Sequence, residues 1–383
     1  MNIAARLVIC QSGLYAANGV LMTFIVVLLA AHGMTTGEVG LAMGLSTLTR
    51  VIAAPLWGYA ADRLGRLRGV MAAGMLTGAL PLIVMLLPQV EGFMPTLGLL
   101  LISSAGASAG FPLTDTMVWR SAMRHGFSFS NVRAAGSALF VAGVLGGGFA
   151  VGWLGSNSVA WLVVVGYLWT VISLPTVAPV PMVVAPRRAA AIRPLLANRD
   201  YRLVLASSAL LQGAHAAYYG FSTLYWGRAG ISNQIIGVLW AEGVVGEIVV
   251  MLLLRNRISR FDPWKLTMVA AGFATLRWVG SALTTDSWML AVLQPLHAMS
   301  FTIPYLAALR IINERSPPHL AATAQTVYAS LGVSAPTGLL MALVSVLYPI
   351  WAGNVFWLMA AFSVAGLVLV WLARRRVVPP GAA

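Results

Sequence analysis

Apolar runs of about 20 residues recur from one end of the chain to the other, separated by short segments that carry most of the charges. A helix rises about 1.5 Å per residue, so each run can cross the ~30 Å hydrocarbon core of a bilayer. We therefore expect an all-α polytopic membrane protein with twelve transmembrane helices. Breaks at charged and turn residues give their approximate ranges as 7–31, 37–61, 67–88, 93–119, 132–153, 158–178, 202–227, 233–254, 264–283, 287–311, 320–346 and 350–373.

The arginines gather in alternate connections between these predicted spans. Loops rich in Lys and Arg stay on the cytoplasmic side of a membrane. The alternation and the even number of spans predict that both termini are cytoplasmic. The basic connections contain Arg63, Arg66, Arg68, Arg120, Arg124, Arg133, Arg187, Arg188, Arg193, Arg199, Arg202, Arg255, Arg257, Arg260, Lys265, Arg310, Arg315, Arg374, Arg375 and Arg376.

The longest polar connection lies almost at the centre of the chain, at residues 179–200, and is rich in Pro and Arg. This composition suits a cytoplasmic linker rather than a lipid-buried helix. We expect an N-terminal six-helix bundle at residues 1–178 and a C-terminal six-helix bundle at residues 201–383. Two related halves of this kind hold a substrate site between them near the bilayer midplane.

The composition supports the membrane assignment and excludes several other classes of protein. Of the 383 residues, 59% are hydrophobic and only 9% are charged, whereas a soluble domain has roughly 25% charged residues. The net charge of +14 follows the loops, so it orients the protein in the bilayer and indicates no nucleic-acid partner. The single cysteine, Cys10, excludes an internal disulfide and a thiol cluster for a metal. We expect a monomer without cofactor.

A short motif between the second and third predicted spans is more specific. Gly58, Asp62, Arg63, Gly65 and Arg66 stand in the order of the GxxxDRxGR signature, so this loop resembles that of the major facilitator superfamily. Glycine permits close helix approach, and the charged side chains could hold a cytoplasmic gate closed. The alternative is an ordinary polar turn with arginines on the cytoplasmic side.

The equivalent loop of the second half, residues 255–262, carries only a degraded version of this motif. Several other segments are similar to the 3-phenylpropionate permease branch, a group of proton-coupled facilitators related to the lactose and nucleoside symporters. This resemblance implies proton symport of an aromatic carboxylate into the cytoplasm across the inner membrane. The segments are FPLTDT (111–116) and the ranges 210–226, 237–247, 276–280 and 293–310.

Polar residues inside the predicted spans are costly in lipid and usually face the interior of the bundle. In the span at 202–227, Gln212, His215 and Tyr219 recur at i, i+3 and i+7, which predicts a shared helical face. His215 lies near the midplane, where it is a candidate to bind substrate or relay a proton. The alternative is a neutral histidine that bonds a neighbouring helix.

Two carboxylates, Glu242 and Glu247, lie in the span at 233–254. Because burial favours the neutral form of a carboxyl group, such a residue can hold a proton and release it on hydration. Glu247 is the preferred proton site, with a structural ion pair as the alternative, and Glu242 is a second candidate. Trp240 shares a helical face with Glu247 and is a candidate substrate contact.

Two arginines, Arg277 and Arg50, lie deep in predicted spans of the two halves. An arginine cannot discharge by losing its proton, so each needs an anion or several carbonyl groups. One arginine is expected to pair internally with Glu247 or Asp115, and the other to bind a substrate carboxylate. A static buried salt bridge is the alternative for each. Asp115 is a candidate for a second proton site, or for a gate partner of Arg133 or Arg120.

Aromatic and polar side chains also recur at helical spacing in two other spans. His297 and Tyr305 share a face of the span at 287–311, and Tyr15 and Asn18 share a face of the first span. Such stripes are candidates to line a cavity for a planar ring, although packing between helices is the alternative.

The leading functional hypothesis is a secondary active transporter, because no GxxxxGK[ST] loop for ATP occurs in the chain. The sequence lacks an HExxH motif and a paired-carboxylate motif with suitable spacing, so an enzyme is not expected, and the loops are too short for the signalling domain of a receptor. Proton-driven export of amphipathic compounds is one alternative, although the glycine-rich stretch at residues 143–148 lacks the proline found in antiporters of the superfamily. Symport of a nucleoside-like or sugar-like solute is another.

Overall fold

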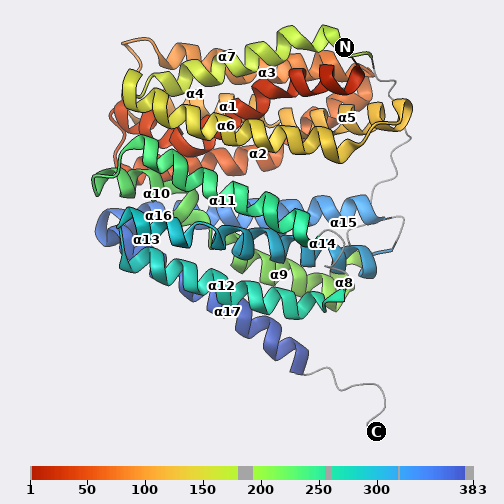
Figure 1. Cartoon of the computed structure of the whole chain (residues 1–383), viewed down its shortest axis with the longest axis vertical. Coiled ribbons are helices and arrows are strands. Elements are labelled where there is room, and N and C mark those ends of the chain that lie inside the picture. The colour runs from red at the N-terminus through yellow and green to blue at the C-terminus, as the bar shows by residue number, and fades with distance from the viewer. Residues whose placement is uncertain (1, 180–192, 255–259, 318–319, 376–383) are drawn as a thin grey trace. The chain divides into compact units, whose positions relative to one another are not determined.

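The computed structural model describes residues 2–179, 193–254, 260–317 and 320–375. Within these ranges the chain forms helices and no β-strand (Figure 1). The α-helices are α1 (Ile3–Ala31), α2 (Thr36–Leu64), α3 (Leu67–Met85), α4 (Phe93–Ala107), α5 (Gly110–His125), α6 (Phe129–Leu154), α7 (Ser158–Ser173), α8 (Arg193–Ala197), α9 (Arg199–Gly213), α10 (Ala216–Arg228), α11 (Asn233–Leu254), α12 (Pro263–Leu283), α13 (Ser287–Leu293), α14 (Ile303–Arg315), α15 (Ala321–Val327), α16 (Ala335–Trp351) and α17 (Val355–Arg375).

The predicted spans fall on these helices or on pairs of consecutive helices. Within the described residues, nine segments are both long and apolar enough to cross a membrane. An all-helical membrane protein is therefore confirmed. The count of twelve crossings and the cytoplasmic position of both termini stay predictions.

The sequence predicted unbroken helices at four places where the structure interrupts them. α9 ends at Gly213 and α10 begins at Ala216, with His215 in the turn between them. α13 ends just before Pro295, which has no N–H to donate to the preceding turn. The other interruptions are the break between α4 and α5 and the π-helical turn Tyr328–Ser334 between α15 and α16; a second π-helical turn, Ala298–Thr302, precedes α14.

The contacts between residues divide the chain into two compact units. Unit 1 consists of Met1–Pro186 and Tyr219–Ala241, and unit 2 consists of Arg187–Tyr218 and Glu242–Ala383. The predicted bundle boundaries stay predictions.

Parts of two predicted segments lie outside the described residues. These are residues 180–192 of the predicted linker, with Arg187 and Arg188, and residues 255–259 of the degraded motif, with Arg255 and Arg257. Arg376 also lies outside them.

In unit 1, α1 packs along both α6 and α7. Figure 1 shows these three helices beside one another. Glycines make this approach possible: a Cβ atom on Gly143 of α6 would overlap the carbonyl oxygen of Ala16, and one on Gly13 of α1 would overlap that of Gly166. Small residues of this kind let helix backbones pack closely in a membrane.

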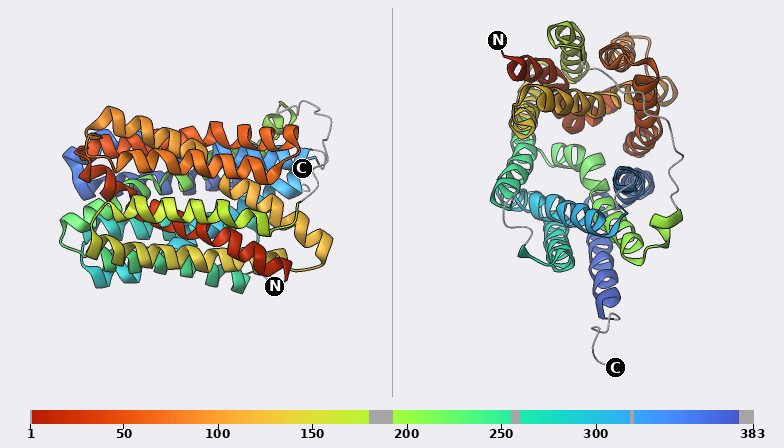
Figure 2. Two further views of the ribbon diagram at one scale, coloured as in Figure 1. Left: turned by 90° about the horizontal axis from the view of Figure 1, so that it is seen from above. Right: turned by 90° about the vertical axis from the view of Figure 1, so that its right-hand side faces the viewer.

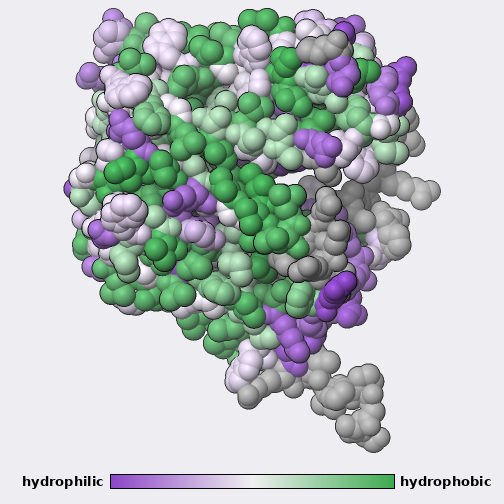
Figure 3. Space-filling view, in the orientation of Figure 1, coloured by the Kyte–Doolittle hydropathy of each residue, from purple (hydrophilic) through white to green (hydrophobic). Residues whose placement is uncertain are grey.

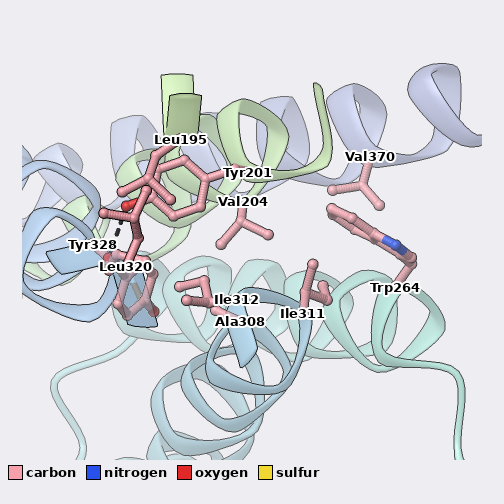
Figure 4. Close-up of a cluster of buried hydrophobic side chains, with 11 residues drawn as sticks. Leu195, Tyr201, Val204, Trp264, Ala308, Ile311, Ile312, Leu320, Tyr328 and Val370 are labelled. Atoms are coloured by element: carbon pink, nitrogen blue, oxygen red, sulfur yellow. Dashed lines mark hydrogen bonds between the residues drawn. The ribbon is translucent and has the colours of Figure 1, made fainter. Parts of the chain in front are cut away.

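In unit 2, α12 and α9 both pack against α17. A cluster of buried side chains joins α8, α9, α12, α14 and α17 (Figure 4). Trp264 of α12 faces Val370 of α17, and Tyr201 of α9 donates a hydrogen bond of 2.7 Å to the carbonyl oxygen of Ala324. The phenol thereby keeps a partner although it is only 1% exposed.

Large hydrophobic side chains also remain on the surface. Trp153, Leu154 and Trp288 are 75%, 76% and 82% exposed, and hydrophobic side chains cover much of the face visible in Figure 3. The end-on view in Figure 2 shows that the long helices within each unit run in nearly the same direction. Exposed apolar surface along aligned helices suits contact with lipid.

Candidate functional site

Three polar side chains meet in the interior of unit 2 and form what we call the buried triad: Glu247, His297 and Arg277. Nε2 of His297 lies 3.1 Å from Oε1 of Glu247, and Nη1 of Arg277 lies 3.0 Å from Nδ1 of the same ring. Arg277 is 1% exposed and His297 5%. The triad joins α11, α12 and the chain just before the π-helical turn Ala298–Thr302.

The chemistry of the three groups fixes where the imidazole hydrogen lies. A guanidinium group only donates hydrogen bonds, so Nδ1 of His297 must accept. The ring hydrogen is then on Nε2, where it donates to the carboxylate of Glu247. A doubly protonated imidazole has no acceptor atom and would carry a positive charge beside Arg277. The ring can therefore gain a proton only if its contact with Arg277 breaks.

Arg277 has further partners within unit 2. Nη2 donates to Oε1 of Gln294 at 3.2 Å, and the guanidinium carbon lies 4.4 Å and 4.5 Å from the ring centres of Tyr218 and Trp278. Of the sequence-based alternatives, the structure places Arg277 in an internal network, linked to Glu247 through a histidine rather than directly. Its charge is compensated inside the protein.

His215 lies beside the triad at the break between α9 and α10. Its ring nitrogens contact the carbonyl oxygen of Leu211 at 3.1 Å and Oγ of Ser300 at 3.3 Å. The ring is fully buried, and its centre lies 5.4 Å from that of His297 and 5.0 Å from that of Trp278. His215 is thus close to the predicted proton site, and bonds a neighbouring helix as the alternative reading expected.

The π-helical turn supplies groups that sequence reasoning missed. Thr302 donates to Oε2 of Glu247 at 3.1 Å, and Ser300 contacts His215. Together with Gln294, these residues surround the triad with hydrogen-bonding side chains. The available signal was a cluster of polar residues around Pro295 in an otherwise apolar span, because a proline at a helix break often accompanies a functional irregularity.

The rings of His297, Phe301 and Tyr305 stack in sequence, as their helical spacing predicted, and their role in lining a cavity stays a prediction. His297 stacks on Phe301 with ring centres 5.4 Å apart, and Phe301 stacks on Tyr305 at 6.5 Å. The stripe ends against the cluster that contains Tyr328, whose ring centre lies 6.1 Å from that of Tyr305.

Two candidate residues of unit 2 hold buried acceptor atoms. Gln212 donates through Nε2 to the carbonyl oxygen of Phe301 at 3.2 Å. Within the described part of the chain, its Oε1 atom and Oε2 of Glu242 are buried without a hydrogen-bond partner. Both atoms are able to accept a hydrogen bond from a ligand.

Of the three residues predicted to share a face, Gln212 and His215 both contact the π-helical turn Ala298–Thr302. Tyr219 departs from the prediction, because the helix breaks before it. Tyr219 belongs to unit 1, where its ring centre lies 6.1 Å from that of Trp240.

Unit 1 contains the second deeply placed arginine, Arg50 of α2. It lies near enough to the phenol of Tyr167 on α7 for the two groups to interact electrostatically. Nε of Arg50 and Oη of Tyr167 are buried, and among the described residues neither atom has a hydrogen-bond partner. Among the described residues no ion pair of Arg50 is seen, and the static salt bridge stays an untested alternative. Nε of Arg50 and Oη of Tyr167 are hydrogen-bond donors that suit an anion.

Asp115 forms an ion pair with Arg133, with 3.7 Å between Oδ1 and Nη1. Both side chains are less than half exposed, at 40% and 44%. The guanidinium also lies 5.3 Å from the ring centre of Tyr15, which contacts Phe111 edge-on at 5.0 Å. Of the two predicted gate partners, the structure thus pairs Asp115 with Arg133. The amide of Asn18 donates to the carbonyl oxygen of Leu14 in its own helix at 2.9 Å.

The loop motif forms the end of α2. Gly65 caps this helix in the left-handed region, with φ of 62°, and Arg63 donates to the hydroxyl of Tyr59 at 3.4 Å. Asp62 and Arg66 are exposed. The close helix approach expected at Gly58 is not seen, since among the described residues no atom lies within 4 Å of a Cβ built there.

Comparison with known proteins relates this chain to transporters. The chain is 35% identical over 184 residues to a probable 3-phenylpropionic acid transporter of Escherichia coli (strain K12), an alignment that covers 48% of this chain and 47% of that transporter. It is 28% identical to a maltose permease of Geobacillus stearothermophilus over 83% of this chain and 81% of the permease. Thus the chain spans about half the length of the first relative and most of the second.

A solved structure of the nucleoside transporter NupG superposes with a TM-score of 0.80, covering 99% of this chain and all of that one, at 16% identity. At this identity the likeness shows the fold alone. The sequence profile of the MFS_1 like family matches residues 7–367. The chain therefore belongs to the MFS_1 like family of membrane transporters.

Proposed function

We propose that this chain is a proton-coupled symporter that takes up a small aromatic carboxylate, such as 3-phenylpropionate, across the cell inner membrane. It works by alternating access between two six-helix bundles whose termini are cytoplasmic. Family membership supports transport of a small molecule, and the buried triad carries the proposal of proton coupling.

The triad links protonation to geometry. In the form described here, Glu247 is a carboxylate that accepts from His297, and Arg277 donates to the opposite side of the ring. A proton added to the imidazole removes the acceptor at Nδ1 that Arg277 needs. A proton added to the carboxylate removes the negative charge of Glu247. Either change weakens this arrangement of the triad. Uncompensated charge is costly at membrane depth, so the two protonation states favour different conformations.

Arg50 supports the proposed substrate class. Arg277 already has side-chain partners in His297 and Gln294. Nε of Arg50 and Oη of Tyr167 are buried without hydrogen-bond partners among the described residues. We therefore assign the substrate carboxylate to Arg50 and leave Arg277 to the proton site. The relation to the 3-phenylpropionic acid transporter, which covers half of that protein, supports an aromatic acid as the solute.

A sugar-like solute is the second candidate, because the maltose permease aligns over more of its own length. Buried acceptors on Gln212 and Glu242 would suit the hydroxyl groups of such a solute. A proton-driven exporter of amphipathic compounds is the remaining alternative, and the direction of transport separates it from the other two.

Purified protein in liposomes provides the test. An inward proton gradient should drive accumulation of labelled 3-phenylpropionate, and a protonophore should abolish it. Maltose and a nucleoside, tested alongside, should not accumulate. Accumulation that persists with the protonophore would contradict proton coupling, accumulation of maltose alone would contradict the aromatic substrate, and expulsion of substrate against an inward proton gradient would indicate export.

The variant Glu247→Gln sharpens this test. An amide cannot take up the coupling proton but can still accept from Thr302, which now contacts Oε2. We expect binding of 3-phenylpropionate to persist while accumulation falls at least tenfold. Asp286→Asn is the matched control, since this carboxylate caps α13 by accepting from the backbone N–H groups of Trp288 and Met289. It should leave accumulation unchanged.

A further inference from the structure

A pocket of about 640 Å³ lies at the end of α5 in unit 1, and its described lining includes none of the residues proposed to bind substrate or protons. Two arginines and a histidine of α5 line it, and the chain after α7 closes the other side. The residues that line the pocket include Trp119, Arg120, Arg124, His125, Ala178 and Pro179.

The cations and the apolar groups of the pocket form two adjacent stripes on α5. Arg120 and Arg124 are four residues apart, so they lie one above the other on the helix. Trp119 and Met123 form a second stripe at the same spacing, and they are 55% and 74% exposed. No acidic residue is among the described residues that line the pocket. A ligand that fits both stripes needs an anionic group joined to an apolar chain.

The place of the pocket along the span points to the source of such a ligand. The apolar segment Phe93–His125 is long enough to cross a membrane, and the pocket lies at its final turns. This end belongs to one of the basic connections that the sequence assigns to the cytoplasmic side. Tryptophan is common at the level of lipid headgroups, as Trp119 would be here.

Basic residues at the end of a helix also have a simpler role. Arg124 and His125 lie in the last turn of α5, where positive charge is favourable beside the free carbonyl groups. That role needs neither a pocket nor an exposed tryptophan beside the cations. The pocket volume and the paired stripes together therefore favour a ligand site over this simpler role.

We propose that this pocket binds the phosphate headgroup of an anionic phospholipid from the cytoplasmic leaflet. Arg120 and Arg124 contact the phosphodiester, and the acyl chains lie along Trp119 and Met123. Basic residues at the membrane surface attract anionic lipid, and a guanidinium adds two-point contact with phosphate oxygens. The proposal does not depend on which solute the protein carries.

Native mass spectrometry of the delipidated full chain, titrated with phosphatidylglycerol or phosphatidylcholine, tests the proposal. We expect phosphatidylglycerol to bind preferentially and the double variant Arg120→Gln/Arg124→Gln to weaken that binding about tenfold or more. The matched control is Arg199→Gln/Arg202→Gln, two arginines of α9 that donate to backbone carbonyl groups in unit 2. It should keep the affinity of the unchanged protein. Equal weakening in both double variants would overturn the proposal, because it would indicate attraction by net charge alone.

Two further experiments distinguish a lipid phosphate from a free phosphate and control for a variant that does not fold. Met123→Ser should weaken binding of phosphatidylglycerol, and inorganic phosphate at millimolar concentration should not displace the lipid. Displacement by phosphate would show a site for a free anion and overturn the lipid proposal. If the double variant does not fold, the single variant Arg124→Gln, at an exposed side chain, replaces it. Retention of lipid affinity within twofold by a folded variant would also overturn the proposal.

Discussion

Nη1 of Arg277 lies 3.0 Å from Nδ1 of His297, so a permanent cation donates to one side of an imidazole whose other side faces Glu247. The arrangement holds only while the ring is neutral. The buried site therefore has a geometry that depends on its protonation, which is the property that a proton-coupled transporter requires.

The variant His297→Gln tests whether the protonation of this ring couples transport to protons. A glutamine can accept from Arg277 and donate to Glu247, but it cannot take up a proton. We expect exchange of labelled for unlabelled substrate to continue in liposomes, while accumulation driven by a proton gradient falls at least tenfold. His215→Gln is the comparison, because that ring contacts Leu211 and Ser300. Loss of exchange as well as accumulation in His297→Gln would instead assign this residue to substrate binding or folding.

A double-mutant cycle on Arg277 and Glu247 tests whether their charges compensate each other through the histidine. The side chain of Glu247 is 16% exposed, so Arg277→Gln alone leaves a partly buried carboxylate without its cation, and we expect the free energy of unfolding to fall by about 1–3 kcal/mol. Addition of Glu247→Gln should recover part of that loss. Unfolding in detergent would be followed for the two single variants and the double variant.

The exposed pair Arg315–Asp200, with side chains 57% and 35% exposed and a separation of 3.3 Å, provides the control cycle. Its coupling should be about 1 kcal/mol or less. Additive losses at Arg277 and Glu247 would contradict the linkage between them.

Two glycines of α6 offer a test of the packing in unit 1. A Cβ atom on Gly143 would overlap the carbonyl oxygen of Ala16, whereas among the described residues no atom lies within 4 Å of a Cβ on Gly146. Gly143→Ala should therefore destabilise the protein by about 1–3 kcal/mol through overpacking. Gly146→Ala should leave stability unchanged or raise it slightly. Thermal unfolding of the two purified variants would check this, and equal melting temperatures would contradict the close approach of α1 and α6.

The sequence predicted much of the helical framework because lipid demands long apolar runs, and such runs are visible without structural knowledge. It also found the three members of the triad, since each is an ionisable residue in an apolar span. It did not predict how they connect. Whether Arg277 reaches Glu247 directly or through His297 depends on the turns near Pro295 and on the π-helical turn that follows, where a single extra residue changes which side chains face each other.

Helix irregularities that the sequence did not reveal also explain the residues that were missed or misplaced. Ser300 and Thr302 have side chains that are ordinary in a membrane helix, and only their position in the π-helical turn directs them to His215 and Glu247. The shared face expected for Gln212 and Tyr219 assumed a regular helix with 3.6 residues per turn. The break after Gly213 removes that assumption.

Arg50 allows the substrate assignment to be tested separately from proton coupling. Nε of Arg50 and Oη of Tyr167 are buried without hydrogen-bond partners among the described residues, so each is a donor available to a substrate carboxylate. Arg50→Gln should weaken binding of 3-phenylpropionate at least tenfold, while binding of the uncharged 3-phenylpropanol should change less than twofold. Tyr167→Phe removes one donor and should weaken binding of the acid only about fivefold. Both affinities can be measured by calorimetry on protein in detergent. Equal loss of acid and alcohol binding in Arg50→Gln would mean that the arginine holds unit 1 together, and the carboxylate would then have to be sought at the triad.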